Sequence, residues 1–512
     1  MTTINDLFAG INGAQPTVVP PLSSLPPLLK RVPLALPLMP FQEKAVDHAL
    51  RDNGHKGYSY IGLEMGLGKT PVGIAVIASS VAAGKTPILV VVPAALRINW
   101  ECELAKFAPW LTHATLRGLR PPDGVTALPD VDVLIIGSTS LSPPAPTKEE
   151  TKANIVPVGW YHLLLGNISG FVVDESHFFK NVSKRTKAMK DIAAATTGVR
   201  VLMSGTPTPN GRHTELAQQI TLMGAQAWRD IGGEGMFWNH YAPKQDAYGT
   251  RGSNDAGGLY KAMSDTWYTR ELRSNVLKMP PKGRKILEVE AQGKAMRDYL
   301  QVERDLIDWL QSENRDTRGA ARNEALVKLT TMRILAGVAK VQGAVKHVIE
   351  VLTTSPGGVF VVAEHRDVMD GMLLGLARFS PASIEGGMTD TQRDQNVQDF
   401  TSGRSRVLVG QIQAAGVGLT LHGGGRNHHE VVVQLPWTPA ALLQVEDRLH
   451  RIGQTNEVDI DICLAAIEGT WTIDERLWGM LESKAFNASS ISDGVGQFLL
   501  SDAVEGLLDT YR

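Results

Sequence analysis

The sequence predicts an α/β protein with two lobes, each built on a parallel β-sheet. Short apolar runs alternate with helical stretches in the first half of the chain, and the same pattern starts again near residue 359. The segment between these halves has the periodicity of long helices. Strands that are apolar along their whole length, rather than at alternate positions, are typical of parallel sheets covered by helices on both faces.

Each half contains five candidate strands. Those of the first half are Tyr58–Leu63, Ile88–Val92, Val133–Ile136, Phe171–Val173 and Val199–Met203. Those of the second half are Val359–Ala363, Ser383–Ile384, Val407–Val409, Val431–Gln434 and Ile460–Cys463. In the middle, Met296, Leu300 and Leu310 belong to a rhythm of three or four residues that predicts a helix. A second helical stretch is expected from about Arg322 to Val351.

Length and composition fit this class and exclude others. A chain of 512 residues is too long for one ordinary domain, and 43% hydrophobic residues can fill a large core. The 51 basic and 53 acidic residues leave a net charge of -2, which excludes a polybasic protein but allows a local basic groove. Two cysteines, Cys102 and Cys463, exclude a disulfide scaffold and a four-cysteine zinc site, and they fit a reducing compartment. We therefore expect a cytoplasmic protein with no signal peptide and no membrane span.

The chain is expected to divide into five segments. Residues 1–37 form a Pro-rich leader, extended rather than packed because proline fixes φ and lacks a backbone donor. Residues 38–285 form the first lobe, 286–340 a helical protrusion and linker, 341–486 the second lobe, and 487–512 a mobile C-terminal tail. A Pro-rich leader can also dock a protein partner, which leaves a scaffold or regulatory subunit as one alternative function.

A candidate phosphate loop follows the first strand. Gly66, Gly68, Lys69 and Thr70 lie between this strand and the helical run Pro71–Ala83, in the order that a phosphate cradle requires. Lys69 would reach the ATP phosphates, and the Thr70 hydroxyl would bind Mg²⁺. Leu63 stands where the strict motif has its leading glycine, so a structural turn is the alternative. The second Gly-Lys-Thr, at residues 84–86, follows a helix and precedes a strand, so Gly84 is interpreted as a helix stop.

A pair of acidic residues and a pair of arginines complete a candidate ATPase site. Asp174 and Glu175 end a buried strand, at the edge where open α/β sheets bind ligands. Asp174 could be a Mg²⁺ ligand, and Glu175 could be the base for the attacking water. The alternative is that the two acids are simply solvated where the strand ends. Arg448 and Arg451 share a helix face and could stabilise the charge of a transferring phosphoryl group. Surface ion pairing is the alternative for these arginines.

In this order the segments resemble a superfamily-two helicase-type motor, and more narrowly the SWI/SNF-related family of DNA translocases, from about Leu38 to Glu482. The resemblance rests on Glu64 to Thr70, on Asp174-Glu175-Ser176-His177, and most specifically on Arg448 to Gln454. The residues Ser176 and Thr420-Leu421 resemble those found at these positions in the annealing-helicase branch of the family. The resemblance implies two RecA-like lobes, ATP with Mg²⁺ as cofactors and DNA as partner.

The resemblance also implies roles for further residues. Gln42 would contact adenine, Gln444, Arg448 and Gly418 would support nucleotide binding, and Arg451 would be the arginine finger. Residues 270–277 resemble the segment that leads out of the first lobe. Some of the expected DNA contacts lie in further segments that resemble motifs of the family. Others are expected from a basic run after the acid pair and from a hydroxyl at a strand end. The expected DNA-facing residues are Pro93, Ser138, Lys180, Asn181, Lys184, Arg185, His365, Gly386, Gly387, Ala415, Gly416 and Trp437. Trp100 is expected to be buried.

The predicted function is an ATP-dependent translocase on double-stranded DNA, acting in remodelling, repair, fork processing or strand annealing. A nucleoid-associated bacterial protein or a phage protein fits this function. A strand-separating DNA or RNA helicase and a nucleotide-gated clamp without turnover remain alternatives. No structural metal is expected, because His422, His428 and His429 lack cysteines and a helical His spacing.

Overall fold

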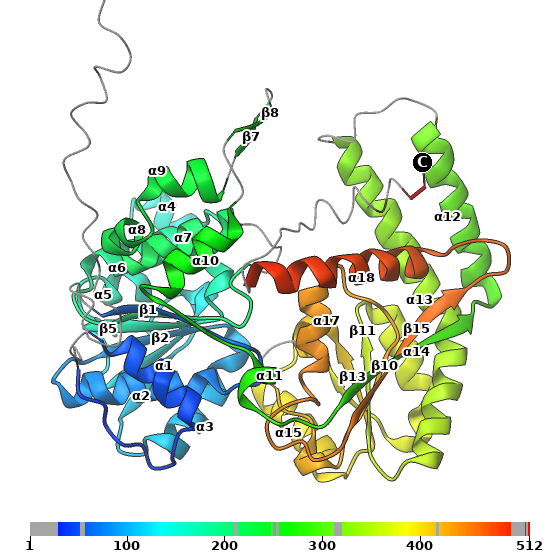
Figure 1. Cartoon of the computed structure of the whole chain (residues 1–512), viewed down its shortest axis with the longest axis horizontal. Helices are drawn as coiled ribbons and strands as arrows, with labels where there is room; N and C mark the ends of the chain where they lie inside the picture. The colour runs from blue at the N-terminus through cyan, green and yellow to red at the C-terminus, as the bar shows by residue number, and fades with distance from the viewer. Residues whose placement is uncertain are drawn as a thin grey trace, which may run out of the picture.

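The structure is a computed structural model (Figure 1). It describes residues 29–51, 57–208, 213–242, 244–246, 249–251, 255–311, 320–415 and 419–492, together with residues 507, 510 and 511. Two lobes stand side by side, each with a sheet between layers of helices, and the chain crosses between them after α11 (Arg273–Val276). The predicted fold class is confirmed.

The first lobe contains a seven-stranded parallel sheet in the order β3-β4-β2-β5-β6-β1-β9. Its strands are β1 (Tyr58–Leu63), β2 (Ile88–Val92), β3 (His113–Leu116), β4 (Val133–Gly137), β5 (Gly170–Asp174), β6 (Arg200–Met203) and β9 (Tyr268–Glu271). Its other helices are α1 (Pro40–Ala49), α2 (Lys69–Ala82), α3 (Arg97–Phe107), α4 (Lys148–Lys152), α5 (Trp160–Leu164), α6 (Lys184–Ala195), α7 (Thr214–Met223), α8 (Ala225–Asp230), α9 (Glu234–Met236) and α10 (Ala256–Ser264). Short helical turns are η3 (Ala94–Leu96), η4 (Ser138–Leu141), η5 (Ser176–Phe179) and η6 (Phe237–Tyr241), and β7 (Lys244–Asp246) pairs with β8 (Gly249–Arg251) in a hairpin.

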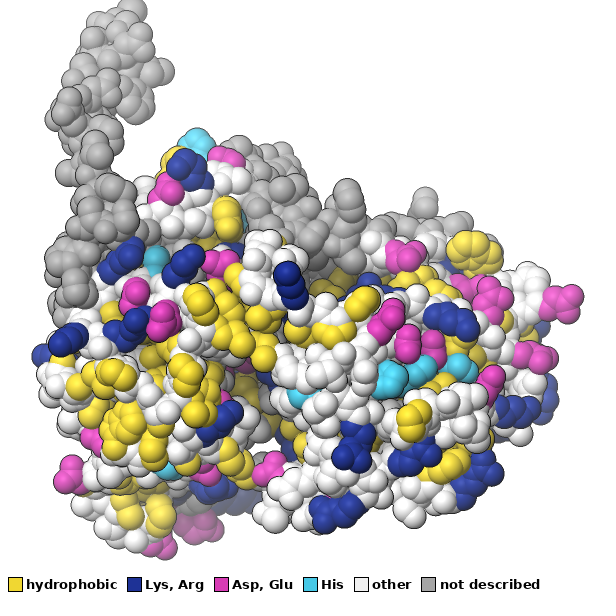
Figure 2. Space-filling model, turned by 60° about the horizontal axis from the view of Figure 1, so that its bottom comes forward, with side chains coloured by type: hydrophobic (Ala, Val, Ile, Leu, Met, Phe, Trp, Pro, Cys, Tyr) yellow, Lys and Arg dark blue, Asp and Glu magenta, His cyan; other side chains and the backbone are white. Residues whose placement is uncertain are grey.

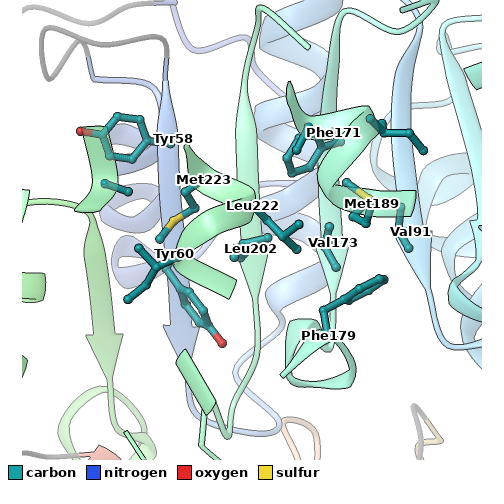
Figure 3. Close-up of a cluster of buried hydrophobic side chains, with 14 of the residues drawn as sticks. Tyr58, Tyr60, Val91, Phe171, Val173, Phe179, Met189, Leu202, Leu222 and Met223 are labelled. Atoms are coloured by element: carbon teal, nitrogen blue, oxygen red, sulfur yellow. The ribbon is translucent and has the colours of Figure 1, made fainter. Parts of the chain in front are cut away.

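Each face of this sheet is covered by its own hydrophobic layer. Tyr58 and Tyr60 of β1 belong to one layer, with Val91 and Val173, as Figure 3 shows. Side chains at the intervening positions of these strands belong to the other layer, with α1, α2 and α3. Burial on both faces explains why the strands are apolar throughout and why their bounds could be predicted closely.

The second lobe contains a six-stranded sheet in the order β10-β15-β14-β11-β13-β12. Its strands, all paired in parallel, are β10 (Lys282–Glu290), β11 (Val359–Ala363), β12 (Ala382–Ile384), β13 (Val407–Gln411), β14 (His429–Val432) and β15 (Val458–Ala466). Its helices are α12 (Gly293–Gln311), α13 (Ala320–Thr354), α14 (Arg366–Gly375), α15 (Asp390–Ser402), α16 (Ile412–Ala415), α17 (Pro439–Glu446) and α18 (Ile473–Ser492), with the short turns η7 (Ala377–Phe379) and η8 (Gly423–Gly425). The long helices α12 and α13 project from the lobe as a pair (Figure 1).

Three strands of the two large sheets were not predicted, namely β3, β9 and β10, and neither was the hairpin of β7 and β8. Side chains of β3 are partly exposed, and β9 ends in Arg270 and Glu271. Strand β10 carries alternating charged residues because it lies at the edge of its sheet. Edge strands lack the continuous apolar pattern that identifies central parallel strands.

The predicted segment bounds can be placed on these elements. The bound at residue 285 falls within β10, which pairs along all nine residues with β15. The bound at residue 486 falls within α18, which continues to Ser492. Leu507 and Tyr511, in the tail that was expected to be mobile, are buried in a hydrophobic layer with α12 and α13. Most of the predicted leader lies outside the described residues.

The end of the leader, residues 29–37, differs from the unpacked arm that was expected. Leu29 and Leu34 pack against the hydrophobic layer of α1 and α2. The backbone N–H of Val32 donates to Ser79 Oγ at 3.1 Å, and that of Ala35 to the Phe107 carbonyl at 2.8 Å. The prolines prevent regular structure here, but the leucines between them still bury apolar surface.

Among the described helices, none has the length and apolar character needed to cross a membrane.

A buried glutamate distinguishes the second sheet. Glu430 of β14 is fully buried, and within the described part of the chain neither carboxylate oxygen has a hydrogen-bond partner. Burial, followed by the negative charge of Glu446, raises the pKa of Glu430 well above its ordinary value. The folded protein therefore holds a proton here that the unfolded chain releases at neutral pH. The free energy of unfolding therefore falls as the pH rises, because folding must bind a proton that becomes scarcer.

We expect Glu430→Gln to raise the free energy of unfolding by about 1–3 kcal/mol above about pH 7, because the amide is neutral in both states and does not have to take up a proton on folding. The gain should shrink towards about pH 4, where the carboxyl is protonated in both states. Urea unfolding across this pH range measures it, with the exposed Glu457→Gln as the control in the same lobe. A gain that is constant with pH would contradict the assignment.

Candidate active site between the two lobes

One cleft of about 340 Å³ receives side chains from both lobes. Most of the residues predicted to handle the nucleotide line it. From the first lobe these are Gln42, Gly66, Gly68, Lys69, Thr70, Asp174 and Glu175, and from the second Arg448 and Arg451. Gln444 lies on α17 but is not among the lining residues, and Gly418 lies outside the described residues.

The phosphate loop joins the buried strand β1 to the start of α2. Gly66 and Gly68 have φ values of +79° and +69°, which a side chain would strain. A Cβ atom at Gly68 would also lie 2.5 Å from Gln42 Nε2. Gln42 Nε2 donates to the carbonyl oxygens of Leu67 and Gly68, at 3.0 and 3.3 Å. The loop therefore needs these glycines for its own backbone path, and Gln42 secures it from α1.

Lys69 lies at the first position of α2 and points back across the loop. Its Nζ donates to the Leu63 carbonyl at 3.2 Å. Burial lowers the pKa of Lys69, and the negative charges of Glu175 and Asp174 oppose this effect. The ammonium group and the two carboxylates thus act on one another across the cleft.

The acid pair sits where β5 ends. Glu175 has a left-handed backbone, with φ of +50°, which is rare for a residue with a side chain. Its Oε2 lies 3.2 Å from His177 Nδ1, which in turn lies 3.0 Å from Ser204 Oγ. Burial alone would raise the pKa of Glu175, but the hydrogen bond and charge of His177, with Lys69, hold it below its ordinary value. Glu175 is therefore ionised at neutral pH.

Asp174 has the opposite electrostatic environment. Burial, followed by the charge of Glu175, raises the pKa of its carboxyl. A bound cation would stabilise a buried carboxylate that lies beside a second negative charge. Asp174 and Thr70 line the same cleft and offer oxygen atoms, which are the ligands that Mg²⁺ prefers. The residues present therefore fit a magnesium ion.

Trp100 is buried as expected, and it also has a polar role. Its Nε1 donates to Asp174 Oδ2 at 2.9 Å, while Asp174 Oδ1 accepts from the Glu175 backbone at 2.9 Å. These two bonds fix the orientation of the carboxylate. A tryptophan on α3, 74 residues before Asp174, carries no sequence signal for this contact.

The two arginines of the second lobe face the cleft from the segment after α17, so the expectation that they share a helix face was wrong. Arg451 Nη1 donates to the Leu419 carbonyl at 2.6 Å and to Thr420 Oγ1 at 3.0 Å. Arg448 Nη1 donates to the same Leu419 carbonyl at 3.3 Å. Burial, and then the charge of Arg451, lowers the pKa of Arg448 to about 9. The side chain of Arg451 also reaches the phosphate loop, since its Cγ would lie 3.5 Å from a Cβ atom at Gly66.

Arg273 of α11 is a site residue that the sequence reasoning did not single out. Its Nη2 donates to the Met65 carbonyl in the phosphate loop and to Asp447 Oδ2 in the second lobe, both at 2.6 Å. Its Nη1 lies 2.7 Å from His450 Nδ1 and donates to the His450 carbonyl at 2.9 Å. Burial opposes its charge, yet Asp447 and Glu64 keep the pKa of Arg273 above its ordinary value. One buried guanidinium thus joins the two lobes beside the cleft.

The residues expected to face DNA occupy several separate places. Lys180 is in an ion pair with Glu215 at 3.0 Å, and Arg185 lies over the ring of Phe178. Asn181 and Lys184 are exposed, whereas Ser138 is buried at the start of η4. Pro93 precedes η3.

In the second lobe the expected DNA-facing residues are equally spread. His365 precedes α14 and is hydrogen-bonded to Gln434. The ring of Trp437 makes a cation–π contact with Arg333. Gly386 and Gly387 line a shallow hollow with Arg366. Ala415 ends α16, and Gly416 lies outside the described residues.

Two parallel-sheet lobes that share a cleft with a phosphate loop, an acid pair and arginines define a helicase-type ATPase. The SNF2-related domain matches residues 42–347, and the helicase conserved C-terminal domain matches residues 343–453. The chain belongs to the SNF2-related family, which confirms the predicted resemblance.

Several relatives illustrate the extent of the match. The DNA annealing helicase and endonuclease ZRANB3 of Bos taurus is 28% identical over 478 residues, which cover 89% of this chain and 41% of that protein. The SWI/SNF-related matrix-associated actin-dependent regulator of chromatin subfamily A-like protein 1 of Xenopus laevis is 28% identical over 462 residues, or 87% and 43% of the two chains. The chain thus spans less than half the length of these relatives. The Sulfolobus solfataricus SWI2/SNF2 ATPase core in complex with dsDNA gives a TM-score of 0.39 at 20% identity, covering 91% of this chain and 95% of that chain.

We expect Trp100→Phe to raise the Mg²⁺ concentration needed for half-maximal ATP hydrolysis by about 10–100-fold, because Asp174 loses its indole donor while the packing is largely kept. Trp267→Phe is the matched control, since Trp267 is equally buried in the same lobe but donates to the Ala227 carbonyl. An unchanged Mg²⁺ dependence in Trp100→Phe would show that the hydrogen bond does not position Asp174.

Proposed function

We propose that this protein is an ATP-dependent motor that moves along double-stranded DNA. The observation that carries the proposal is the composition of the cleft. Its phosphate loop and acid pair come from one lobe, and its arginines come from the other. A site divided in this way can hydrolyse ATP only while the lobes are together, so turnover is coupled to lobe movement.

The proposed chemistry assigns one task to each charged group. Lys69 holds the β- and γ-phosphates, and Glu175, ionised at neutral pH, orients the attacking water and accepts its proton. Arg451, with Arg448 beside it, stabilises the charge that develops on the γ-phosphoryl group. Thr70 and Asp174 would hold a Mg²⁺ ion, which supplies charge neutralisation on the phosphates. Gln42 at the rim of the cleft is proposed to contact the base, and Gln444 and Gly418 remain proposed supporting contacts.

DNA is the proposed track because the two relatives described above are named for DNA or chromatin functions. Exposed basic groups after the acid pair, including Lys184 and Lys187, support contact with phosphates without sequence reading. The other expected DNA contacts, and the preference for duplex or branched DNA in repair, fork processing or annealing, belong to the same proposal. So do the predicted association with the nucleoid of a bacterial or phage-infected cell and a protein partner for the leader.

We expect Glu175→Gln to bind ATP normally but to lose about 10²–10⁴-fold in turnover, since the amide cannot accept a proton. Arg451→Ala should lose about 10³–10⁵-fold in turnover, with nucleotide affinity largely kept. Phosphate release and the binding of a fluorescent nucleotide measure both effects, with the exposed Arg404→Ala as control. Unimpaired hydrolysis in Glu175→Gln would disprove its role as the base.

The substrate is tested by measuring ATP hydrolysis with linear duplex, forked, gapped and single-stranded DNA and with RNA. Stimulation by duplex or forked DNA supports the proposal. Stimulation by single strands or RNA alone would favour a strand-separating helicase instead.

A further inference from the structure

A second group of potential ligands lies in the second lobe, away from the nucleotide cleft. His347 of α13, His429 of β14 and Asp461 of β15 bring two imidazole nitrogens and a carboxylate oxygen within 4.8 Å of one another. None of these residues lines the cleft. Figure 2 shows histidine side chains close to acidic ones on the surface of this lobe.

The geometry of the group is specific. The Nε2 atoms of both histidines point at the same oxygen, Asp461 Oδ2, at 2.7 Å for His347 and 2.8 Å for His429. Two imidazoles converging on one oxygen require a proton on each Nε2, unless a cation lies between the three atoms. Imidazole nitrogen with carboxylate oxygen is the ligand set of Zn²⁺ and of its neighbours Co²⁺ and Ni²⁺.

The fold places these ligands on rigid elements. His429 pairs with Asp459 across the parallel strands β14 and β15, so Asp461 lies two residues further along on the same face. On this face Val431 of β14 and Cys463 of β15 pack against α13, which carries His347 one residue before the buried Val348. The three ligands therefore sit at the border of a packed layer. The two histidine side chains are 16% and 21% exposed, which leaves access for an ion and a water.

An outer carboxylate supports His429. Its Nδ1 lies 3.9 Å from Asp459 Oδ2. A histidine that binds a metal through one nitrogen commonly has a carboxylate near the other, which orients the ring and raises its basicity.

We propose that His347, His429 and Asp461 form a binding site for a divalent transition-metal ion of the Zn²⁺ class. Ligand atoms around tetrahedral Zn²⁺ are about 3.3–3.5 Å apart, given bonds of about 2.0–2.2 Å, so loading requires the imidazoles to withdraw by about half an ångström. The ion binds the Nε2 lone pairs of the two neutral imidazoles, whose single protons then lie on Nδ1, and water takes the open fourth position. The loaded site connects α13, the helix of the protrusion, to the sheet of the second lobe.

This site was not expected from the sequence. The histidines considered there were His422, His428 and His429, which are close in the chain. The structure instead joins His429 to Asp461, 32 residues away, and Asp461 to His347, 114 residues away.

Titration of the chelator-treated full chain with Co²⁺ in excess Mg²⁺ tests the proposal, followed by calorimetry and visible absorption. Excess Mg²⁺ occupies oxygen-only sites such as that of Asp174 and Thr70. We expect one Co²⁺ per chain with an intense visible absorption of low-coordinate cobalt, which Zn²⁺ displaces. His347→Gln, His429→Gln and Asp461→Asn should each lower the affinity by more than about tenfold, and the outer variant Asp459→Asn by about tenfold. The exposed His113→Gln of the first lobe is the control.

Binding that survives all three ligand variants, or the absence of Co²⁺ binding, would overturn the proposal and leave the group as a hydrogen-bonded tie between α13 and the sheet. A second measurement does not depend on how the variants fold. Crystals of the unaltered protein soaked in Co²⁺ should show an anomalous peak between the three side chains. A peak found only in the nucleotide cleft would contradict the site.

Discussion

The arrangement of the cleft depends on one buried guanidinium, that of Arg273. Its two terminal nitrogens contact the Met65 carbonyl in the phosphate loop, and Asp447 and His450 in the segment that carries the arginines. A buried charge is stable only when its hydrogen bonds are made, so separation of the lobes must expose both Arg273 and Asp447 to water. This contact therefore holds the two lobes in one specific register.

This register brings the phosphate loop and the segment that carries Arg448 and Arg451 together. Gly66 lies between the side chains of Arg273 and Arg451, each 3.5 Å from the position that a Cβ atom would take. The acid pair is likewise connected to the rest of its lobe through His177 and Ser204, and through Trp100. A change at the loop can thus reach the arginines through short contacts, and the acids through the charge of Lys69. In the proposed motor, these contacts would couple nucleotide hydrolysis to lobe movement.

Sequence reasoning recovered what depends on local pattern and missed what depends on distant contacts. The central strands and the phosphate loop could be predicted because burial on both faces and glycines at a strand–helix junction leave direct marks on the sequence. Edge strand β10 could not, because its charged residues hide it. The partners of Arg273 lie up to 208 residues away, and Trp100 lies 74 residues before Asp174. Helix and strand periodicities relate residues only a few positions apart, so they cannot predict contacts over such separations. These contacts become visible only in the folded structure.

A double-mutant cycle on Arg273→Gln and Asp447→Asn, read by ATP hydrolysis with duplex DNA, tests most directly whether this interlobe contact assembles the site. If it does, each single variant lowers turnover, and the double variant is little worse than the more damaged single one. The coupling energy should then be about 1.5 kcal/mol or more. Effects that add to within about 0.5 kcal/mol, or single variants with normal turnover, would contradict the account.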